Sequence, residues 1–244
     1  MKGKLVIVST GPGSREHITT AALEAVSEAD VIVGYKTYLG LVEELLEGKK
    51  VISNGMRQEV ERCSAAIEEA RKGSSVCIIS GGDAGVYGLA GLVLELLSES
   101  EQSAVTVIPG VTSATACASL LGAPLIHDFA VISLSNLLTE SDLIRKRLRL
   151  AAEGDFVTVL YNPKSIKRTT LFRETAEIFM KTRSDETPVG LVRDAYRENQ
   201  SIKITTLAHL KDEEWVDMRT TVIIGNSQTL VSGERMITPR GYRI

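Results

Sequence analysis

The chain has 244 residues, 43% of them hydrophobic and 24% charged, an ordinary composition for a globular protein of one large domain or two smaller ones. A formal net charge of −3 provides no general attraction to nucleic acid or to an anionic membrane surface. Three scattered cysteines and three isolated histidines indicate neither a disulfide framework nor a metal site, and no apolar run reaches the length of a signal peptide or a membrane span, so we expect a cytoplasmic protein.

Short apolar runs alternate with longer amphipathic runs in the first half of the chain. The apolar runs are rich in Val and Ile, which predicts buried parallel strands, and the amphipathic runs predict helices on both faces of the sheet. The predicted strands are 5–8, 31–34, 51–53, 76–80 and 104–110, and the clearest predicted helices are 21–29, 60–73 and 88–99.

The same alternation resumes near residue 128. Strands are predicted at 129–135, 156–163, 187–195, 201–206 and 220–227, and helices at 143–154 and 170–182. The boundary is placed between residues 120 and 121, within a stretch of small residues that ends in Gly122 and Pro124. We therefore expect an α/β protein of two lobes, 1–120 and 121–244, with mostly parallel sheets and a cleft between the lobes.

Glycine and small polar residues follow most of the predicted strands. The stretch SGGDAGVYG at 80–88 is the densest example, and comparable endings occur at 9–13, 109–113 and 161–163. Ligands of α/β sheets bind beyond the carboxyl ends of the strands, so these endings predict a ligand site. The dinucleotide fingerprint fails because Glu16 stands where its third glycine belongs, and neither a P-loop nor a GxSxG elbow is present.

Together these stretches resemble the tetrapyrrole methylase family, and within it the branch that methylates C17 of precorrin-3B or cobalt-factor III. The resemblance covers essentially the whole chain and is carried by SGGDAGVYGLAG (80–91), APLIHDFAVISLS (123–135), LYNPKS (160–165) with Arg168, and MITPRGY (236–242). Two positions depart from the family pattern. Ser9 replaces the first glycine of GxGPG, and Asn136 stands where the branch tends to have Asp.

The resemblance implies that S-adenosylmethionine (SAM) binds between the lobes, largely through main-chain groups. Asp83 could pair with the methionyl ammonium or could cap the helix that follows, and both interpretations stay open. The other residues that the resemblance assigns to SAM are Pro12, Gly81, Gly82, Val86, Thr112, Ser113, Asn162 and Ala195.

Family membership further implies that a macrocycle carbon attacks the sulfonium methyl, with S-adenosylhomocysteine as product and contraction of the ring. Contraction requires proton transfer, for which His127, Asp128 and Tyr35 are candidates. For His127 a structural role is an open alternative, and for Tyr35 the alternative is an aromatic lid or packing residue. No protein-bound metal is expected.

The tetrapyrrole substrate carries many carboxylates, which basic side chains can bind through charge-assisted hydrogen bonds. The candidates are Gly11, Gly13, Lys36, Arg57, Lys164 and Arg168, although each cation alone could be a solvated surface charge. The resemblance implies a homodimer, and the net charge of −3 leads us to expect neither a nucleic-acid nor a membrane partner. The alternatives are a methylase of the same fold with another target position or substrate, and a non-catalytic tetrapyrrole carrier, which would release no S-adenosylhomocysteine.

Overall fold

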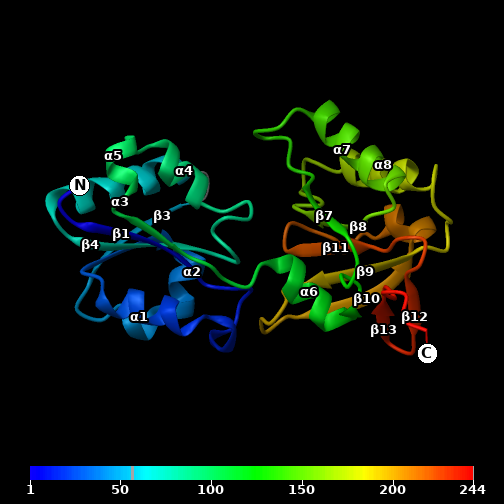
Figure 1. Cartoon of the computed structure of the whole chain (residues 1–244), viewed down its shortest axis with the longest axis horizontal. Coiled ribbons are helices and arrows are strands. Elements are labelled where there is room, and N and C mark those ends of the chain that lie inside the picture. The colour runs from blue at the N-terminus through cyan, green and yellow to red at the C-terminus, as the bar shows by residue number, and fades with distance from the viewer. Residues whose placement is uncertain (56–57, 244) are drawn as a thin grey trace. The chain divides into compact units, whose positions relative to one another are not determined.

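The computed structural model describes residues 1–55 and 58–243, which form two compact units, Met1–Ser113 and Ala114–Ile244 (Figure 1). The division falls earlier than the sequence suggested because helix α6 (Ser113–Leu121) packs within the second unit. A Cβ on Gly190 in the second sheet would lie 2.4 Å from the Leu121 side chain, which shows how closely α6 approaches that sheet.

The first unit contains a five-stranded sheet in the order β3-β2-β4-β1-β5, in which every pair of neighbours is parallel. This confirms the parallel sheet predicted from the Val- and Ile-rich runs. The strands are β1 (Lys4–Ser9), β2 (Val31–Tyr35), β3 (Lys50–Asn54), β4 (Ser75–Ser80) and β5 (Val105–Ile108).

Helices cover both faces of this sheet. On one face Ile7 and Ile78 pack with residues of α3 (Glu59–Lys72) and α4 (Ala90–Glu95), and on the other Val8 and Ile79 pack with α1 (Thr20–Glu28). The alternation follows from the period of two in strand side chains. The described part of this unit also contains shorter helical segments: η1 (Arg15–His17), α2 (Lys36–Leu39), η2 (Gly40–Leu45) and α5 (Glu99–Gln102).

The second unit contains a mixed sheet in the order β10-β9-β11-β8-β7. Only β7 and β8 pair in parallel, and the other three pairs are antiparallel, so the expectation of a mostly parallel second sheet is wrong. The cause is the connection from β9 to β10, residues 194–200, which is too short for a crossover helix and reverses the chain. The strands are β7 (Phe129–Ser133), β8 (Val157–Tyr161), β9 (Pro188–Arg193), β10 (Ser201–Thr206) and β11 (Thr220–Ile224).

Helices α7 (Ser141–Glu153) and α8 (Thr170–Phe179) connect β7, β8 and β9 and cover one face of the second sheet, and η3 (Leu207–Asp212) packs beside α8. Helix α6 covers the other face. A small third sheet joins β12 (Leu230–Ser232), β13 (Arg235–Ile237) and β6 (Gly122–Ala123). Because β7, β8 and β9 run in the same direction, their carboxyl ends meet at one edge.

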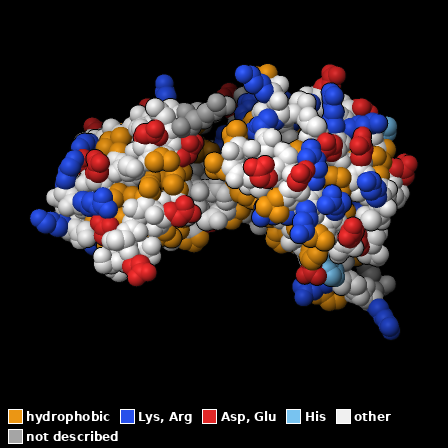
Figure 2. Space-filling model, turned by 90° about the horizontal axis from the view of Figure 1, so that it is seen from above, with side chains coloured by type: hydrophobic (Ala, Val, Ile, Leu, Met, Phe, Trp, Pro, Cys, Tyr) orange, Lys and Arg blue, Asp and Glu red, His pale blue; other side chains and the backbone are white. Residues whose placement is uncertain are grey.

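Surface charge, cysteine placement and metal-ligating side chains can be compared with the expectations drawn from the composition. On the face drawn in Figure 2, basic and acidic side chains of the second unit are interspersed rather than gathered into one basic field. Cys63, Cys77 and Cys117 are buried and unpaired, and burial raises the pKa of their thiols to about 11, 12 and 11. Among the described residues there is no cluster of metal-ligating side chains and no helix that could cross a membrane.

Glu101 should make the stability of the first unit depend on pH. Two hydrogen bonds from Arg71 (2.8 and 3.0 Å) and two from Ser98 lower the pKa of Glu101 to about 2, from an ordinary value of 4.5. A lowered pKa in the folded state stabilises the fold above the ordinary pKa, and this contribution is lost as pH falls through the lowered value. Glu101→Gln should therefore destabilise the protein at pH 7, with the difference from wild type vanishing between about pH 4.5 and 2.

Urea unfolding at a series of pH values measures this difference, and Glu99→Gln, which removes an exposed carboxylate from the same helix, is the matched control. A difference between Glu101→Gln and wild type that stays constant down to pH 2 would contradict the assignment.

Candidate active site

Three loops of the first unit leave the carboxyl edge of its sheet, after β1, β4 and β5, and hydrogen bonds join them. Gly11 and Gly82 exchange two main-chain hydrogen bonds, 3.0 Å from the Gly11 nitrogen and 2.8 Å from the Gly82 nitrogen. Both glycines have left-handed backbones, with φ of +68° and +64°. Side chains other than glycine adopt this region at a cost, so the pairing accounts for two of the glycines in these loops.

Ser9 adds a second connection between the same loops. Its hydroxyl is fully buried at the end of β1 and accepts a hydrogen bond from the Ala84 nitrogen at 2.9 Å. The side chain that departs from the family pattern thus supplies a bond that glycine could not make. It also constrains Gly110, because a Cβ there would lie 2.6 Å from both Ser9 Cβ and the Gly82 oxygen.

Asp83 connects the loop after β4 to the loop after β5. Its carboxylate accepts hydrogen bonds from the Gly85 nitrogen at 2.8 Å and from the Gly110 nitrogen at 2.9 Å. Helix α4 begins only at Ala90, so Asp83 braces two loops rather than capping that helix. A carboxylate has about four acceptor positions, and the two bonds leave capacity for a ligand.

Tyr38 forms one wall of this loop cluster, and no sequence motif points to it. A Cβ on Gly81 would lie 2.4 Å from the Tyr38 ring, so Gly81 is a glycine because the ring lies against its main chain. Tyr35 makes an edge-to-face contact with Tyr38 (centroids 5.7 Å apart), and the Arg62 guanidinium lies 5.8 Å from the centre of the Tyr35 ring. Tyr35 therefore belongs to a packed aromatic group at the end of β2.

The remaining candidates of the first unit lie on the same edge. Gly11 and Pro12 are buried, while Gly13, Val86, Thr112 and Ser113 are partly buried. Lys36 is exposed at the start of α2. Arg57 lies outside the described residues.

At the carboxyl edge of the second sheet, the structure brings Asn162 and Ala195 to the ends of β8 and β9. Asn162 has φ of +52° and donates a hydrogen bond to the Ser133 hydroxyl at 3.0 Å. Ala195 is buried between Asp194 and Tyr196, whose φ angles are +50° and +58°. Left-handed residues other than glycine are uncommon and gather at functional sites, so their concentration on this edge supports a ligand site there.

Two tyrosines that sequence reasoning missed hold α6 beside this edge. The Tyr161 hydroxyl accepts a hydrogen bond from the Ala114 nitrogen at 2.7 Å, which occupies a free amide in the first turn of α6. The Tyr196 hydroxyl is 2.8 Å from the Ser119 hydroxyl on the same helix.

His127 and Asp128 are not brought to this edge. The main-chain oxygen of Asp128 accepts a hydrogen bond from the nitrogen of Val157, the first residue of β8, so both residues lie at the amino end of β7. The length of β7 then separates them from Ser133 by roughly 16–20 Å at about 3.3 Å per residue. Both are exposed, and with Arg240 they line a groove of about 430 Å³ at the opposite edge.

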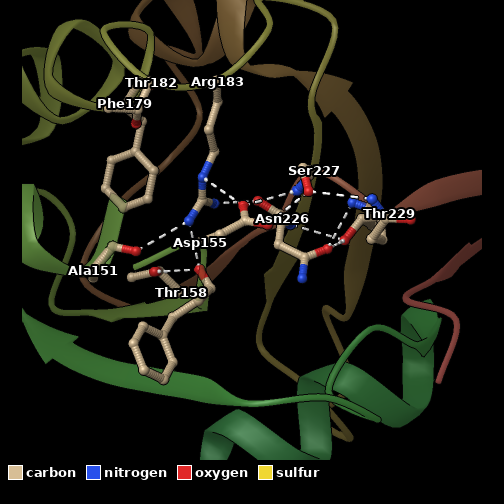
Figure 3. Close-up of polar contacts among 12 residues, drawn as sticks. Ala151, Asp155, Thr158, Phe179, Thr182, Arg183, Asn226, Ser227 and Thr229 are labelled. Carbon is tan, nitrogen blue, oxygen red and sulfur yellow. Dashed lines mark hydrogen bonds and ion pairs between the residues drawn. The ribbon is translucent and has the colours of Figure 1, made fainter. Parts of the chain in front are cut away.

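The buried side chain of Arg183 makes polar contacts with residues that lie near this groove, among them Asp155 (Figure 3). The Arg183 guanidinium donates to the main-chain oxygens of Phe156 (2.7 Å), Ala151 (3.2 Å) and Gly225. Asp155 forms an ion pair with it at 3.6 Å and accepts two hydrogen bonds from Ser227. Burial lowers the pKa of Arg183. Its partners are three main-chain carbonyls, one carboxylate and the Phe179 ring, whose centre lies 4.7 Å from the guanidinium, which indicates that Arg183 holds the loops at this edge in place.

Comparison with known proteins gives the family. A model of the tetrapyrrole (corrin/porphyrin) methylases matches residues 4–211. The chain belongs to the tetrapyrrole methylase family. The α/β fold expected for a member of this family is confirmed by its similarity to the crystal structure of the methyltransferase CobJ, with a TM-score of 0.90 at 33% identity over 97% of this chain and 100% of that one.

Two curated relatives are closely similar to this tetrapyrrole methylase. It is 48% identical to a probable cobalt-factor III C(17)-methyltransferase from Salmonella typhimurium, over 98% of this chain and all of the relative. It is 50% identical to a cobalt-factor III methyltransferase from Priestia megaterium, and the match includes all of this chain and 46% of that longer relative.

Gly110 should be intolerant of any side chain. In Gly110→Ala the new methyl group would lie 2.6 Å from the Gly82 oxygen and Ser9 Cβ, and neither can withdraw without disturbing the Gly11–Gly82 pair. Overpacking of this kind typically lowers the free energy of unfolding by about 1–3 kcal/mol. Urea denaturation measures the loss.

The matched control is Gly91→Ala on α4, where an added Cβ meets no atom within 4 Å. It should be neutral or should stabilise the protein by up to about 1 kcal/mol, the helix-propensity difference between the two residues. Equal effects of the two substitutions would contradict the packing described for the loops.

Proposed function

We propose that this protein transfers the methyl group of SAM to C17 of a cobalamin precursor, precorrin-3B or cobalt-factor III, with contraction of the macrocycle. The observation that carries the proposal is the 48% identity to a relative of that name over the full length of both chains. The names of the two relatives described above favour the cobalt-bearing substrate.

The joined loops of the first unit suit the methyl donor. An added Cβ at Gly82 would meet nothing nearer than Thr112 Cα at 4.0 Å, so a ligand can approach its main chain closely. The spare acceptor positions of Asp83 suit the methionyl ammonium of SAM. Pro12, Gly81, Val86, Thr112 and Ser113 are its further proposed contacts in this unit, and Asn162 and Ala195 are the proposed contacts of adenosine.

The contribution expected of the protein is orientation. Bound SAM supplies a methyl group already activated as a sulfonium, so the side chains need not generate a nucleophile or a leaving group. Fixing two reactants in line can lower a barrier by about 7–11 kcal/mol. Hydrogen bonds join the loop that contains Gly82 to the loop after β1, through Gly11, and to the loop after β5, through Asp83. These bonds restrict the movement of the loop and suit it to hold the donor in one orientation.

Tyr35 is the acid–base candidate that lies at the carboxyl edge of its sheet, and we retain it as the proposed proton carrier for ring contraction. His127 and Asp128 are left out because they lie at the opposite edge of theirs. The homodimer and the cytoplasmic location stay predictions.

Product analysis tests the function. The protein is incubated with SAM and either cobalt-factor III or precorrin-3B, and both products are identified by mass spectrometry. The proposal predicts release of S-adenosylhomocysteine and a ring-contracted macrocycle with a new methyl group bonded to C17, heavier by one CH2 because a proton is lost from elsewhere in the macrocycle. Binding of the macrocycle without release of S-adenosylhomocysteine would indicate a carrier, and methylation at another ring position would overturn the C17 assignment.

Ser9 should contribute to donor affinity. Ser9→Ala leaves the buried Ala84 nitrogen without an acceptor and frees the loop that carries Asp83. A hydrogen bond of this kind contributes about 0.5–1.5 kcal/mol, so the dissociation constant of S-adenosylhomocysteine should rise about 2- to 10-fold in isothermal titration.

Thr10→Val is the matched control for Ser9→Ala. The Thr10 hydroxyl is also buried, but it donates to the main-chain oxygen of Ser80, the last residue of β4, rather than to a residue beyond the strand. Its loss should leave donor affinity unchanged. Affinities that fall equally in the two variants would show that Ser9 acts only through general stability.

A further inference from the structure

Three basic side chains at the carboxyl edge of the second sheet converge on residues 213–218, the segment between η3 and β11. Lys164, in the loop after β8, donates to the main-chain oxygens of Glu213 (3.3 Å) and Glu214 (3.4 Å). Arg193, the last residue of β9, donates to the Trp215 oxygen at 3.3 Å, and its guanidinium lies 5.1 Å from the centre of the Trp215 ring.

Arg168 is the third member of this group and reaches the segment from the loop after β8. It donates to the Met218 sulfur at 3.2 Å. Two main-chain hydrogen bonds between Ser165 and Arg168, at 3.0 and 3.1 Å, close a tight turn that fixes its backbone. The turn leaves the Ile166 side chain fully exposed beside the basic group.

No described carboxylate lies within ion-pair distance of Lys164, Arg168 or Arg193. Three nearby acidic groups pair with other cations, since Glu213 pairs with Lys203 (2.6 Å), and Asp194 and Asp217 pair with Arg219, while the Glu214 side chain is exposed. Furthermore, Arg168 Nη1 and Arg193 Nε are buried and have no hydrogen-bond partner. Buried polar groups are normally satisfied, so these donors indicate a missing acceptor.

Arg62 Nε and Arg183 Nε are also buried without a hydrogen-bond partner, but each of these arginines lies against an aromatic ring and donates to a main-chain oxygen, and two further arginines have carboxylate partners. Arg145 pairs with Glu174 and Asp142, and Arg71 pairs with both oxygens of Glu101. Lys164, Arg168 and Arg193 therefore differ from these pairs, because they have no carboxylate partner among the described residues and two of their guanidinium donors are unused. The chemistry that satisfies such donors best is a carboxylate, since the planar guanidinium can bind both of its oxygens.

We propose that Arg168 and Arg193, supported by Lys164, bind the peripheral carboxylates of the tetrapyrrole, while Ile166 contacts its apolar face. The inference rests on the proposed function and deepens it by assigning a substrate-recognition role to Arg193. The methionyl carboxylate of the donor has the same chemistry, and the experiment separates the two sources.

The test compares binding of two probes to the folded full-length protein. Uroporphyrin, a stable macrocycle with carboxylates around its rim, is followed by quenching of its fluorescence, and S-adenosylhomocysteine by isothermal titration. Arg193→Gln and Arg168→Gln should each weaken uroporphyrin binding about tenfold and leave the binding of S-adenosylhomocysteine unchanged. Arg193→Lys should recover part of the loss, and the difference from wild type should shrink at high salt.

Arg147→Gln is the matched control, because it removes the same charge from an exposed position on α7. It should leave both affinities at the wild-type value. Thermal unfolding identifies any variant that does not fold, and if Arg193→Gln is one, Arg168→Gln and Arg193→Lys decide the question.

Uroporphyrin binding by Arg193→Gln and Arg168→Gln equal to that of Arg147→Gln would overturn the proposal. Weaker binding of S-adenosylhomocysteine with unchanged uroporphyrin binding would assign the arginines to the donor and would also overturn it. The outcome is independent of turnover. A protein that binds uroporphyrin through Arg193 but methylates neither precursor would refute the proposed function alone.

Discussion

The paired hydrogen bonds between Gly11 and Gly82 are the constraint on which the first unit's edge depends. They join the loop after β1 to the loop after β4, and both glycines must be left-handed for the bonds to form. Ser9 and Asp83 then extend the connection to Ala84 and to the loop after β5. Loops at strand ends are usually the mobile parts of a fold, and here four hydrogen bonds give them the fixed geometry that a binding site needs.

The second unit reaches a rigid edge by a different route. Asn162, Asp194 and Tyr196 have left-handed backbones, a conformation that costs residues other than glycine free energy and persists only where contacts enforce it. The Ser133 hydroxyl holds Asn162, Arg219 pairs with Asp194, and the Tyr196 nitrogen donates to the Gln200 side chain. Three of the four left-handed residues other than glycine in the second unit thus lie at the carboxyl edge, where the proposed ligands would bind, and the fourth, Asp155, lies at the opposite edge.

Much of this arrangement could be predicted from the sequence because its signals are local. Runs of Val and Ile gave the strands, and glycines next to Asp83 gave the loop after β4. The antiparallel strands of the second sheet were missed because apolar periodicity does not encode strand direction. Tyr38 and Arg193 were missed because their roles arise from contacts with Gly81 and Trp215, which are distant in the chain. His127 was placed near the site by chain position, whereas the direction of β7 carries it to the other edge.

Amide hydrogen exchange of the ligand-free protein tests most directly whether the loops are joined before any ligand binds. The account predicts that the amides of Gly11, Gly82, Ala84 and Gly110, each a donor in the loop network, exchange as slowly as amides inside β1 and β4. Exchange of these four amides at the rate of an open loop would contradict it, because the edge would then be assembled by the ligand rather than by the chain.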